Sequence, residues 1–203
     1  MKSKLPNSKL WDYFILIARF LLAITFLQYG ISKLTIGQFG IAQDELLTPI
    51  KDLSLFKVMW YLFDHQPFKG FIGFSQVVCG ALLLVNRTTL IGAILFLPIT
   101  VTILVMDISF MSTDMAIGFA WRLTSYLILD GLIIWHYRDK IRIAIRAITK
   151  NVRPKYTYTF WVYLLLPIFA IALEMTLAFP RIALQAITHP AELFSAIQQL
   201  NLF

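Results

Sequence analysis

Residues 90–137 read LIGAILFLPITVTILVMDISFMSTDMAIGFAWRLTSYLILDGLIIWHY. Two apolar runs lie within this stretch, at 90–107 and 118–137, and a short loop that contains Asp114 separates them. Each run has about the 20 apolar residues that an α-helix needs to cross a bilayer. The stretch therefore predicts two consecutive transmembrane helices.

Three more runs of similar length lie on either side of this pair, at 11–33, 68–85 and 160–179. The last is expected to stop at Pro180, because proline interrupts a helix. A shorter apolar and aromatic run at 53–63 is too short to span and predicts an interfacial helix. The sequence thus predicts an all-α bundle with five spans in a single integral membrane domain, residues 1–203.

The composition supports this assignment. Of the 203 residues, 59% are hydrophobic and 14% are charged, whereas soluble domains have about 45–50% and about 25%. The run at 11–33 follows a basic N-terminus, so a cleaved signal peptide is the alternative. The run is long, contains Arg19 and lacks a clear small-x-small cleavage site. We therefore expect it to be retained as a membrane anchor.

A basic amphipathic helix is predicted at 138–150, between the last two spans. Its positive side chains recur every four residues and share one stripe: Arg138, Arg142, Arg146 and Lys150. Isoleucines occupy the opposite side, which suits a helix lying among anionic headgroups better than one that binds nucleic acid. Near the C-terminus, Leu193, Phe194, Ile197 and Leu200 share one face and predict a short surface helix.

The distribution of charge predicts the orientation of the spans. Lysine and arginine gather before residue 11, at Arg87 and across 138–155, which five spans place on one side of the membrane. Because basic residues concentrate on the cytoplasmic side, we expect a cytoplasmic N-terminus and an extracytoplasmic C-terminus in the cell membrane.

Two ionisable residues lie deep within predicted spans. Arg19 is eight residues into the first span, and Asp130 is seven residues from the inner end of the fourth. At about 1.5 Å per residue, both lie about 10–12 Å above the inner surface. Charges at this depth need a partner. We therefore predict that they form a buried ion pair, so that Asp130→Leu alone should leave Arg19 unpaired and destabilise the bundle.

A second polar cluster is expected near the outer face, beneath the loop of residues 35–66. Its members end or begin the spans or lie in their outer halves: Lys33, Asp107, Arg122, Gln76 and Glu174. Together they are expected to line a polar vestibule, although Lys33 and Arg122 are also close enough to the interface to extend into water. Which molecule would enter such a site is left open by these residues.

Other kinds of site have little support in the sequence. Cys79 is a lone cysteine, and the three histidines lie on different predicted helices, so a metal site is not expected. Gly73 and Gly80 are one heptad apart in the second span, where small residues allow close helix packing. No cofactor ligands are evident, and whether the protein is an enzyme stays open.

Two segments resemble the DoxX family of membrane proteins. They are Arg19-Phe20-Leu21 with Gln28-Tyr29-Gly30-Ile31-Ser32-Lys33-Leu34, and the second helix with its hairpin from Gly73 to Thr88. The resemblance covers residues 15–110 and implies a four-helix core, to which the fifth span would be an addition. Many relatives have a glutamate where this chain has Gln76, so an acid–base role there does not carry over.

Three functions are considered for this chain, and the resemblance implies the first two. The first is an integral or accessory subunit of a quinone-linked redox complex, with a quinone or lipid in an apolar cavity ringed by Arg19, Gln76 and Asp130. The second is a non-catalytic assembly chaperone or scaffold for a membrane complex. A small-molecule transporter is a third, weakened by the lack of a visible internal repeat. In the first two cases the partner is another membrane or membrane-associated protein.

Overall fold

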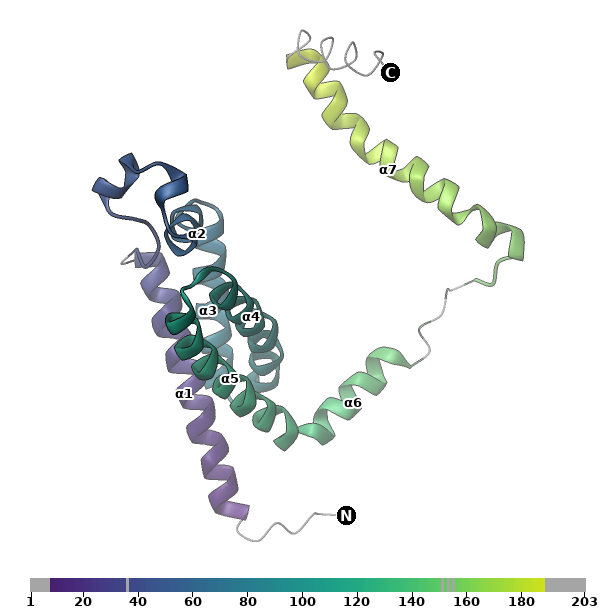
Figure 1. The fold of residues 1–203 in the computed structure, drawn as a ribbon. Helices are drawn as coiled ribbons and strands as arrows, with labels where there is room; N and C mark the ends of the chain where they lie inside the picture. Colours follow the sequence, from purple (N-terminus) through teal and green to yellow (C-terminus); the bar gives the residue numbers. More distant parts are fainter. Residues whose placement is uncertain (1–7, 36, 151, 153, 155, 189–203) are drawn as a thin grey trace. The chain divides into compact units, whose positions relative to one another are not determined.

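The computed structural model describes residues 8–35, 37–150, 152, 154 and 156–188. Its elements are, in chain order, α1 (Ser8–Thr35), the 3₁₀ turns η1 (Gln43–Leu47) and η2 (Ile50–Asp52), α2 (Leu55–Phe63), α3 (Phe68–Leu84), α4 (Thr89–Phe110), α5 (Thr113–His136), α6 (Arg138–Thr149) and α7 (Phe160–Thr188) (Figure 1). The described residues form helices and no strands, which confirms the all-α prediction. Two units, 1–149 and 150–203, are described separately below.

Four helices of the first unit form the core predicted from the sequence. Helix α1 packs against α3 and α5, and α4 packs against the same two helices, so the four enclose a common interior. Apolar side chains fill it, among them Ile15, Leu22, Phe26, Phe96 and Ile133, which are almost inaccessible to solvent. The rings of Phe26 and Phe96 pack against each other at a tilt of 31°, with centroids 4.1 Å apart. All four helices contribute buried apolar side chains to this interior, and their packing stabilises the bundle.

Glycines allow α1 and α3 to approach closely. A Cβ atom on Gly80 would lie 2.8 Å from the carbonyl oxygen of Ala23, and one on Gly30 would lie 2.7 Å from that of Gly73. These contacts are to backbone atoms, which can retreat only if a whole helix moves. The close packing predicted from Gly73 and Gly80 is therefore confirmed, with Gly30 supplying the matching surface on α1.

Two polar contacts fix the register between α1 and α5. The indole Nε1 of Trp11 donates to Nδ1 of His136 at 3.0 Å, near one end of the pair. Near the other end, Nη1 of Arg122 donates to the hydroxyl of Tyr29 at 3.4 Å. The contact made by the later residue of α1 is thus to the earlier residue of α5, so the two helices run antiparallel.

The membrane spans follow the prediction with differences at their ends. Four helical segments are long and apolar enough to cross a bilayer: Lys9–Thr35, Thr89–Phe110, Thr113–His136 and Phe160–Leu177. Helix α3 qualifies only together with α2, from which it departs at an angle of 82°. The described residues therefore provide four spans, or five if that bent pair counts as one.

Two predicted boundaries were wrong. Helix α5 begins at Thr113 rather than at residue 118, so the loop after α4 is shorter than expected. Helix α7 does not stop at Pro180 but continues to Thr188 with Pro167 and Pro180 inside it. Prolines are tolerated inside membrane helices when neighbouring groups satisfy the freed carbonyls. The short surface helix predicted after residue 190 lies outside the described residues.

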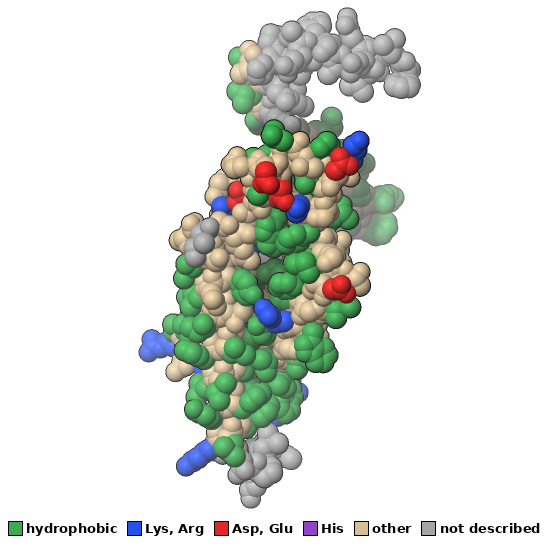
Figure 2. All heavy atoms as spheres, turned by 60° about the vertical axis from the view of Figure 1, so that its left-hand side comes forward, with side chains coloured by type: hydrophobic (Ala, Val, Ile, Leu, Met, Phe, Trp, Pro, Cys, Tyr) green, Lys and Arg blue, Asp and Glu red, His purple; other side chains and the backbone are tan. Residues whose placement is uncertain are grey.

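The outer surface of the first unit suits a lipid environment. Figure 2 shows a broad apolar band over the helices, with most charged side chains gathered toward its ends. Large apolar side chains that point outward include Ile17, Phe20, Ile91 and Ile94, all of them more than 50% exposed. In water such a surface would be unfavourable, whereas hydrocarbon accommodates it. The protein is therefore a multi-pass membrane protein.

Candidate functional site: a lipophilic pocket with a polar end

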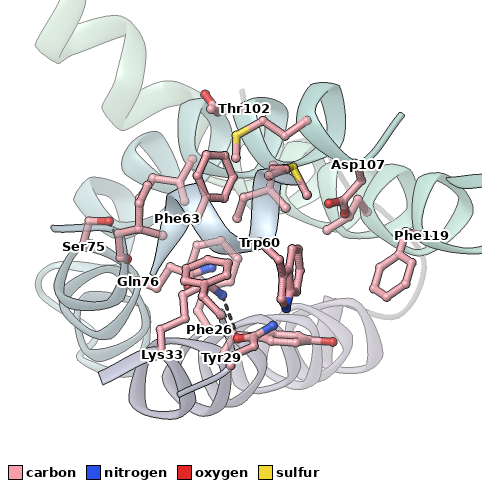
Figure 3. A pocket seen from close by; sticks show the side chains of 18 of the residues that line it. Phe26, Tyr29, Lys33, Trp60, Phe63, Ser75, Gln76, Thr102, Asp107 and Phe119 are labelled. Atoms are coloured by element: carbon pink, nitrogen blue, oxygen red, sulfur yellow. Dashed lines mark hydrogen bonds between the residues drawn. The ribbon is translucent and has the colours of Figure 1, made fainter. Parts of the chain in front are cut away.

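A cavity of about 500 Å³ lies inside the first unit. Its walls come from α1, α3, α4 and α5, and from α2 with the loop before it. Figure 3 shows the side chains converging on it from these elements, with Phe26, Phe63 and Trp60 among the apolar ones. Most of the residues that line it are aromatic, aliphatic or methionine. A cavity of this size and character accommodates a drug-sized lipophilic molecule.

Helix α2 and the preceding loop form an aromatic cover over the cavity. The rings of Phe56 and Trp60 lie 4.4 Å apart between centroids, and Phe39 meets both Trp60 and Phe63 edge-on. The backbone N–H of Gly40, which adopts a φ of 105°, donates to the carbonyl of Trp60 at 3.0 Å. The cover is thus held by ring stacking and by a main-chain contact.

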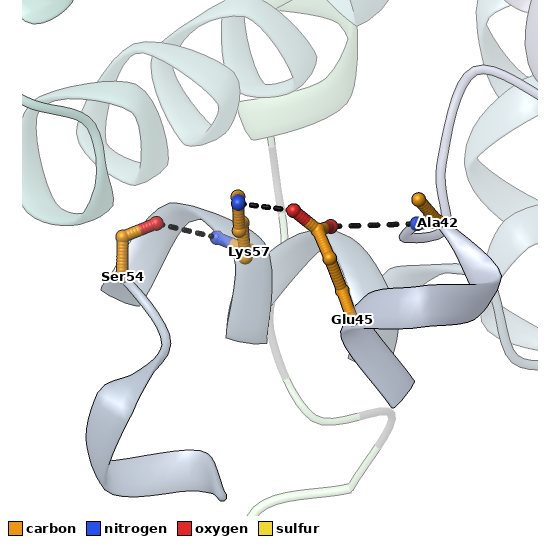
Figure 4. Close-up of polar contacts among 4 residues, drawn as sticks. All are labelled: Ala42, Glu45, Ser54 and Lys57. Atoms are coloured by element: carbon orange, nitrogen blue, oxygen red, sulfur yellow. Dashed lines mark hydrogen bonds and ion pairs between the residues drawn. The ribbon is translucent and has the colours of Figure 1, made fainter. Parts of the chain in front are cut away.

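Polar contacts at the outside of the cover fix its fold (Figure 4). The hydroxyl of Ser54 accepts a hydrogen bond from the backbone N–H of Lys57 and caps the start of α2. The carboxylate of Glu45 bonds both the ammonium group of Lys57 and the backbone N–H of Ala42. These contacts connect η1 to α2. A helix is therefore present within the predicted stretch 53–63, as α2, and it contributes to the wall of the cavity.

Lys33 supplies the positive charge of the pocket. It lies in the last turn of α1, is 6% exposed, and donates to Oε1 of Gln38 at 3.0 Å. Its Nζ also lies 5.3 Å from the ring centroids of Tyr29 and Phe39, in the range of cation–π attraction. Aromatic faces and one amide oxygen thus stabilise an ammonium group that is almost out of contact with water.

Asp107 supplies the negative charge. It lines the pocket from α4, is 6% exposed, and is close enough to Lys33 for the two charges to interact. The two residues are not in direct contact, since no ion pair within 4 Å joins them in the part of the chain that the structure describes. Among the same residues, nothing donates a hydrogen bond to the Asp107 carboxylate. The carboxylate faces the cavity with its acceptor capacity unused.

Gln76 and Arg122 complete the polar lining. Gln76 is 2% exposed on α3, and its Oε1 has no hydrogen-bond partner among the described residues. Arg122 lines the cavity from α5, beside Tyr29 and Phe119. Its guanidinium carbon lies 5.8 Å from the centroid of the Phe119 ring. The structure thus brings four of the five residues predicted for the outer cluster into the walls of one pocket.

Glu174, the fifth predicted member of the cluster, lies on α7 in the second unit and is exposed.

The predicted ion pair between Arg19 and Asp130 was wrong. Nη2 of Arg19 donates to the carbonyls of Leu83 and Leu84 at 3.1 and 3.3 Å and to Oδ1 of Asn86 at 2.9 Å. The last carbonyls of a helix have no partner within it and carry partial negative charge, so they compete well for a guanidinium group. Arg19 therefore caps the C-terminal end of α3.

Asp130 is left without a partner. It is 0% exposed, and neither carboxylate oxygen has a hydrogen bond within the described chain. The two contacts that fix the α1–α5 register nevertheless place Arg19 and Asp130 at the same level. The two residues lie level with each other as predicted, but they do not pair. The predicted cavity ringed by Arg19, Gln76 and Asp130 was also wrong, because only Gln76 lines the pocket.

The basic stripe forms as predicted on α6. Arg142 and Arg146 are exposed, and so are Ile145 and Ile148 on the other side. The guanidinium of Arg138 stacks over the ring of Trp135 with 4.7 Å between Cζ and the ring centroid. Lys150 directly follows the helix, which ends at Thr149.

Sequence reasoning missed the aromatic half of the site. The missed residues that form the cover or stack near the charges are Tyr29, Phe39, Phe56, Trp60 and Phe63. The dense aromatic content of 53–63 was the available signal, and it was assigned only to the membrane interface.

Comparison with known proteins identifies relatives of this chain. The DoxX family model matches residues 14–107. A protein of Bacillus subtilis (strain 168), described as uncharacterized protein YwoB, is 32% identical over 123 residues, which cover 60% of this chain and 75% of that protein. No solved structure matches the chain significantly.

Proposed function

Because this chain belongs to the DoxX family of membrane proteins, we propose that it binds a quinone-class molecule in the pocket and serves as a subunit of a quinone-linked membrane redox complex. The observation that carries the proposal is the pocket itself. It combines an apolar, aromatic cavity of about 500 Å³ with hydrogen-bonding groups at Lys33, Asp107 and Gln76. A quinone has the matching form, with a flat ring, polar oxygens and an apolar chain.

The aromatic lining favours a planar ring over a flexible acyl chain. Phe26, Tyr29, Trp60, Phe63 and Tyr126 offer ring faces and edges on several sides of the cavity. Aromatic pairs contribute about 0.5–1.5 kcal/mol beyond the area they bury. In this role electrons pass between the bound quinone and a redox centre on a partner protein. The protein lies in the cell membrane with its N-terminus in the cytoplasm, in keeping with the charge distribution.

Binding to the purified full chain in nanodiscs tests the proposal. We expect a short-chain benzoquinone to bind the wild type and Ile103→Trp to weaken binding at least about tenfold, since the new ring occupies the cavity that Ile103 lines. Val105→Trp is the matched control, because Val105 lies on the same helix, is 57% exposed and does not line the pocket. Titration calorimetry measures both affinities.

Lipid extraction and affinity purification from native membranes complete the test. The expected result is a quinone in the extract and a co-purifying protein with the absorption spectrum of a redox centre. No binding by the wild type, together with neither quinone nor redox partner, would overturn the proposal. A co-purifying complex without redox centres would favour the scaffold function instead.

We further propose that α6 rests on anionic lipid headgroups. The exposed stripe of Arg142 and Arg146 opposite Ile145 and Ile148 supports this, as does the tether to the membrane span α5, which ends two residues before α6 begins. An environment-sensitive dye at Ile145→Cys is expected to emit further to the blue in nanodiscs with phosphatidylglycerol than in purely zwitterionic ones. Arg142→Gln with Arg146→Gln should remove that difference, and an unchanged difference would contradict the proposal.

A further inference from the structure

We infer that the pocket selects a ligand whose head group donates hydrogen bonds, so that it takes a hydroquinone in preference to the corresponding quinone. The inference rests on the proposed function for the class of molecule. The preference itself comes from the polar atoms in the pocket wall. The protein would therefore hold the reduced form of the ligand more tightly than the oxidised form.

The wall offers acceptors that the protein leaves unused. Oε1 of Gln76 has no partner among the described residues, although its side chain is 98% buried. Nothing in the described chain bonds the carboxylate of Asp107 either, and an ionised carboxylate can only accept. A buried acceptor without a donor is unfavourable, and a charged one is more so. A ligand that brings donors to these atoms recovers that cost.

The wall also contains donors, and its two cationic side chains are partly engaged. Lys33 already donates to Gln38, and Arg122 donates to Tyr29. Lys33 has further N–H groups for one ligand oxygen, since an ammonium group carries three donors. Lys33 and Asp107 line the same cavity without direct contact. The head group between them therefore needs to accept from one side and donate to the other.

A phenolic hydroxyl meets both needs, and a quinone carbonyl meets only one. Each O–H of a hydroquinone both donates and accepts, as a tyrosine hydroxyl does. A quinone oxygen can accept from Lys33 or from the amide NH₂ group of Gln76, but it brings no donor to the Asp107 carboxylate or to Oε1 of Gln76. Binding the quinone would leave the carboxylate unsatisfied in an apolar cavity.

Three probes that share one ring and one alkyl chain separate the hydrogen bonds from the ring: 2-decyl-1,4-benzoquinone, the hydroquinone formed from it by two-electron reduction, and the dimethyl ether of that hydroquinone. Their affinities for the full chain are measured by titration calorimetry in nanodiscs without oxygen. We expect the hydroquinone to bind at least about tenfold more tightly than either other probe, since one hydrogen bond to a charged group is worth that factor. The dimethyl ether keeps the reduced ring and has no O–H to donate.

Asp107→Asn is the variant that assigns the preference. The amide is similar in shape and can donate through its NH₂ group, so the hydroquinone and the quinone should bind within about twofold of each other. Asp114→Asn is the matched control, because Asp114 is exposed in the first turn of α5 and does not line the pocket. Gln76→Met is a second variant, expected to weaken the hydroquinone and to leave the dimethyl ether unchanged.

Each outcome has a defined meaning. Equal wild-type affinity for the hydroquinone and the quinone would overturn the inference and leave the proposed function standing. Tighter binding of the quinone would also overturn it. A hydroquinone preference that persists in both Asp107→Asn and Gln76→Met would overturn the assignment to these acceptors. If none of the three probes bound, the proposed function would fail as well.

Discussion

Gly80→Val is expected to lower the free energy of unfolding of the bundle by about 3 kcal/mol or more, at the upper end of the range for overpacking. Even the Cβ atom alone would lie 2.8 Å from the Ala23 carbonyl oxygen and 2.9 Å from Cγ of Leu27. The first of these is a backbone atom of α1, so the contact cannot be relieved by a change of side-chain rotamer. Helix α1 would have to move away from α3 along the closest interface of the core.

Gly131→Val is the matched control for this prediction. Gly131 is a helical glycine of α5, and an added Cβ there would meet nothing within 4 Å. Because glycine is a poor helix former, this change should be neutral or stabilise slightly. Unfolding of both variants in mixed micelles, followed by circular dichroism over a titration with a denaturing detergent, measures the difference. Equal losses in the two variants would show that close approach at Gly80 is not what matters.

Arg19→Met is expected to destabilise the bundle by about 3 kcal/mol or more, whereas Asp130→Leu should leave it unchanged or stabilise it. The methionine would strand the carbonyls of Leu83 and Leu84 that Arg19 now satisfies at the end of α3. Leucine, in contrast, removes a carboxylate that is fully buried and has no partner in the described chain. This expectation reverses the one that follows from an ion pair.

The double variant Arg19→Met with Asp130→Leu decides between independent residues and an ion pair. If the residues act independently, the two changes add within about 0.5 kcal/mol. An ion pair would instead make the double variant much more stable than the sum of the single changes predicts. Asn86→Ala, which removes only one of the acceptors of Arg19, should cause a smaller loss than Arg19→Met and serves as a graded control.

The contrast between these residues shows how far the sequence could determine the site. Depth in the membrane follows from counting along apolar runs, and the prediction of equal depth for Arg19 and Asp130 agrees with the register of α1 and α5. The partner that a buried side chain finds around the helix axis depends on which helices are its neighbours and on which backbone acceptors nearby are free. The carbonyls at the end of α3 are such acceptors, and no side-chain pattern reveals them.

The polar end of the pocket was more predictable than its aromatic cover. Lys33, Asp107 and Arg122 lie near the ends of apolar runs, and antiparallel spans bring such ends together at one side of the membrane. The cover depends on how α2 is folded back, which the bend before α3 and the contacts of Gly40 and Lys57 determine. These are specific tertiary contacts, and a run of apolar residues is compatible with many of them.

The bend between α2 and α3 also bears on the membrane around the protein. Helix α3 has 17 residues and rises about 25 Å, whereas α4 has 22 and rises about 33 Å. The hydrocarbon core of a typical bilayer is about 30 Å thick. One flank of the bundle is therefore shorter than the bilayer and another is slightly longer, which favours tilting or local thinning on the α3 side. The thickness of the bilayer should therefore affect the binding measurements in nanodiscs. A bilayer of shorter acyl chains is the better match for the side where α2 covers the cavity.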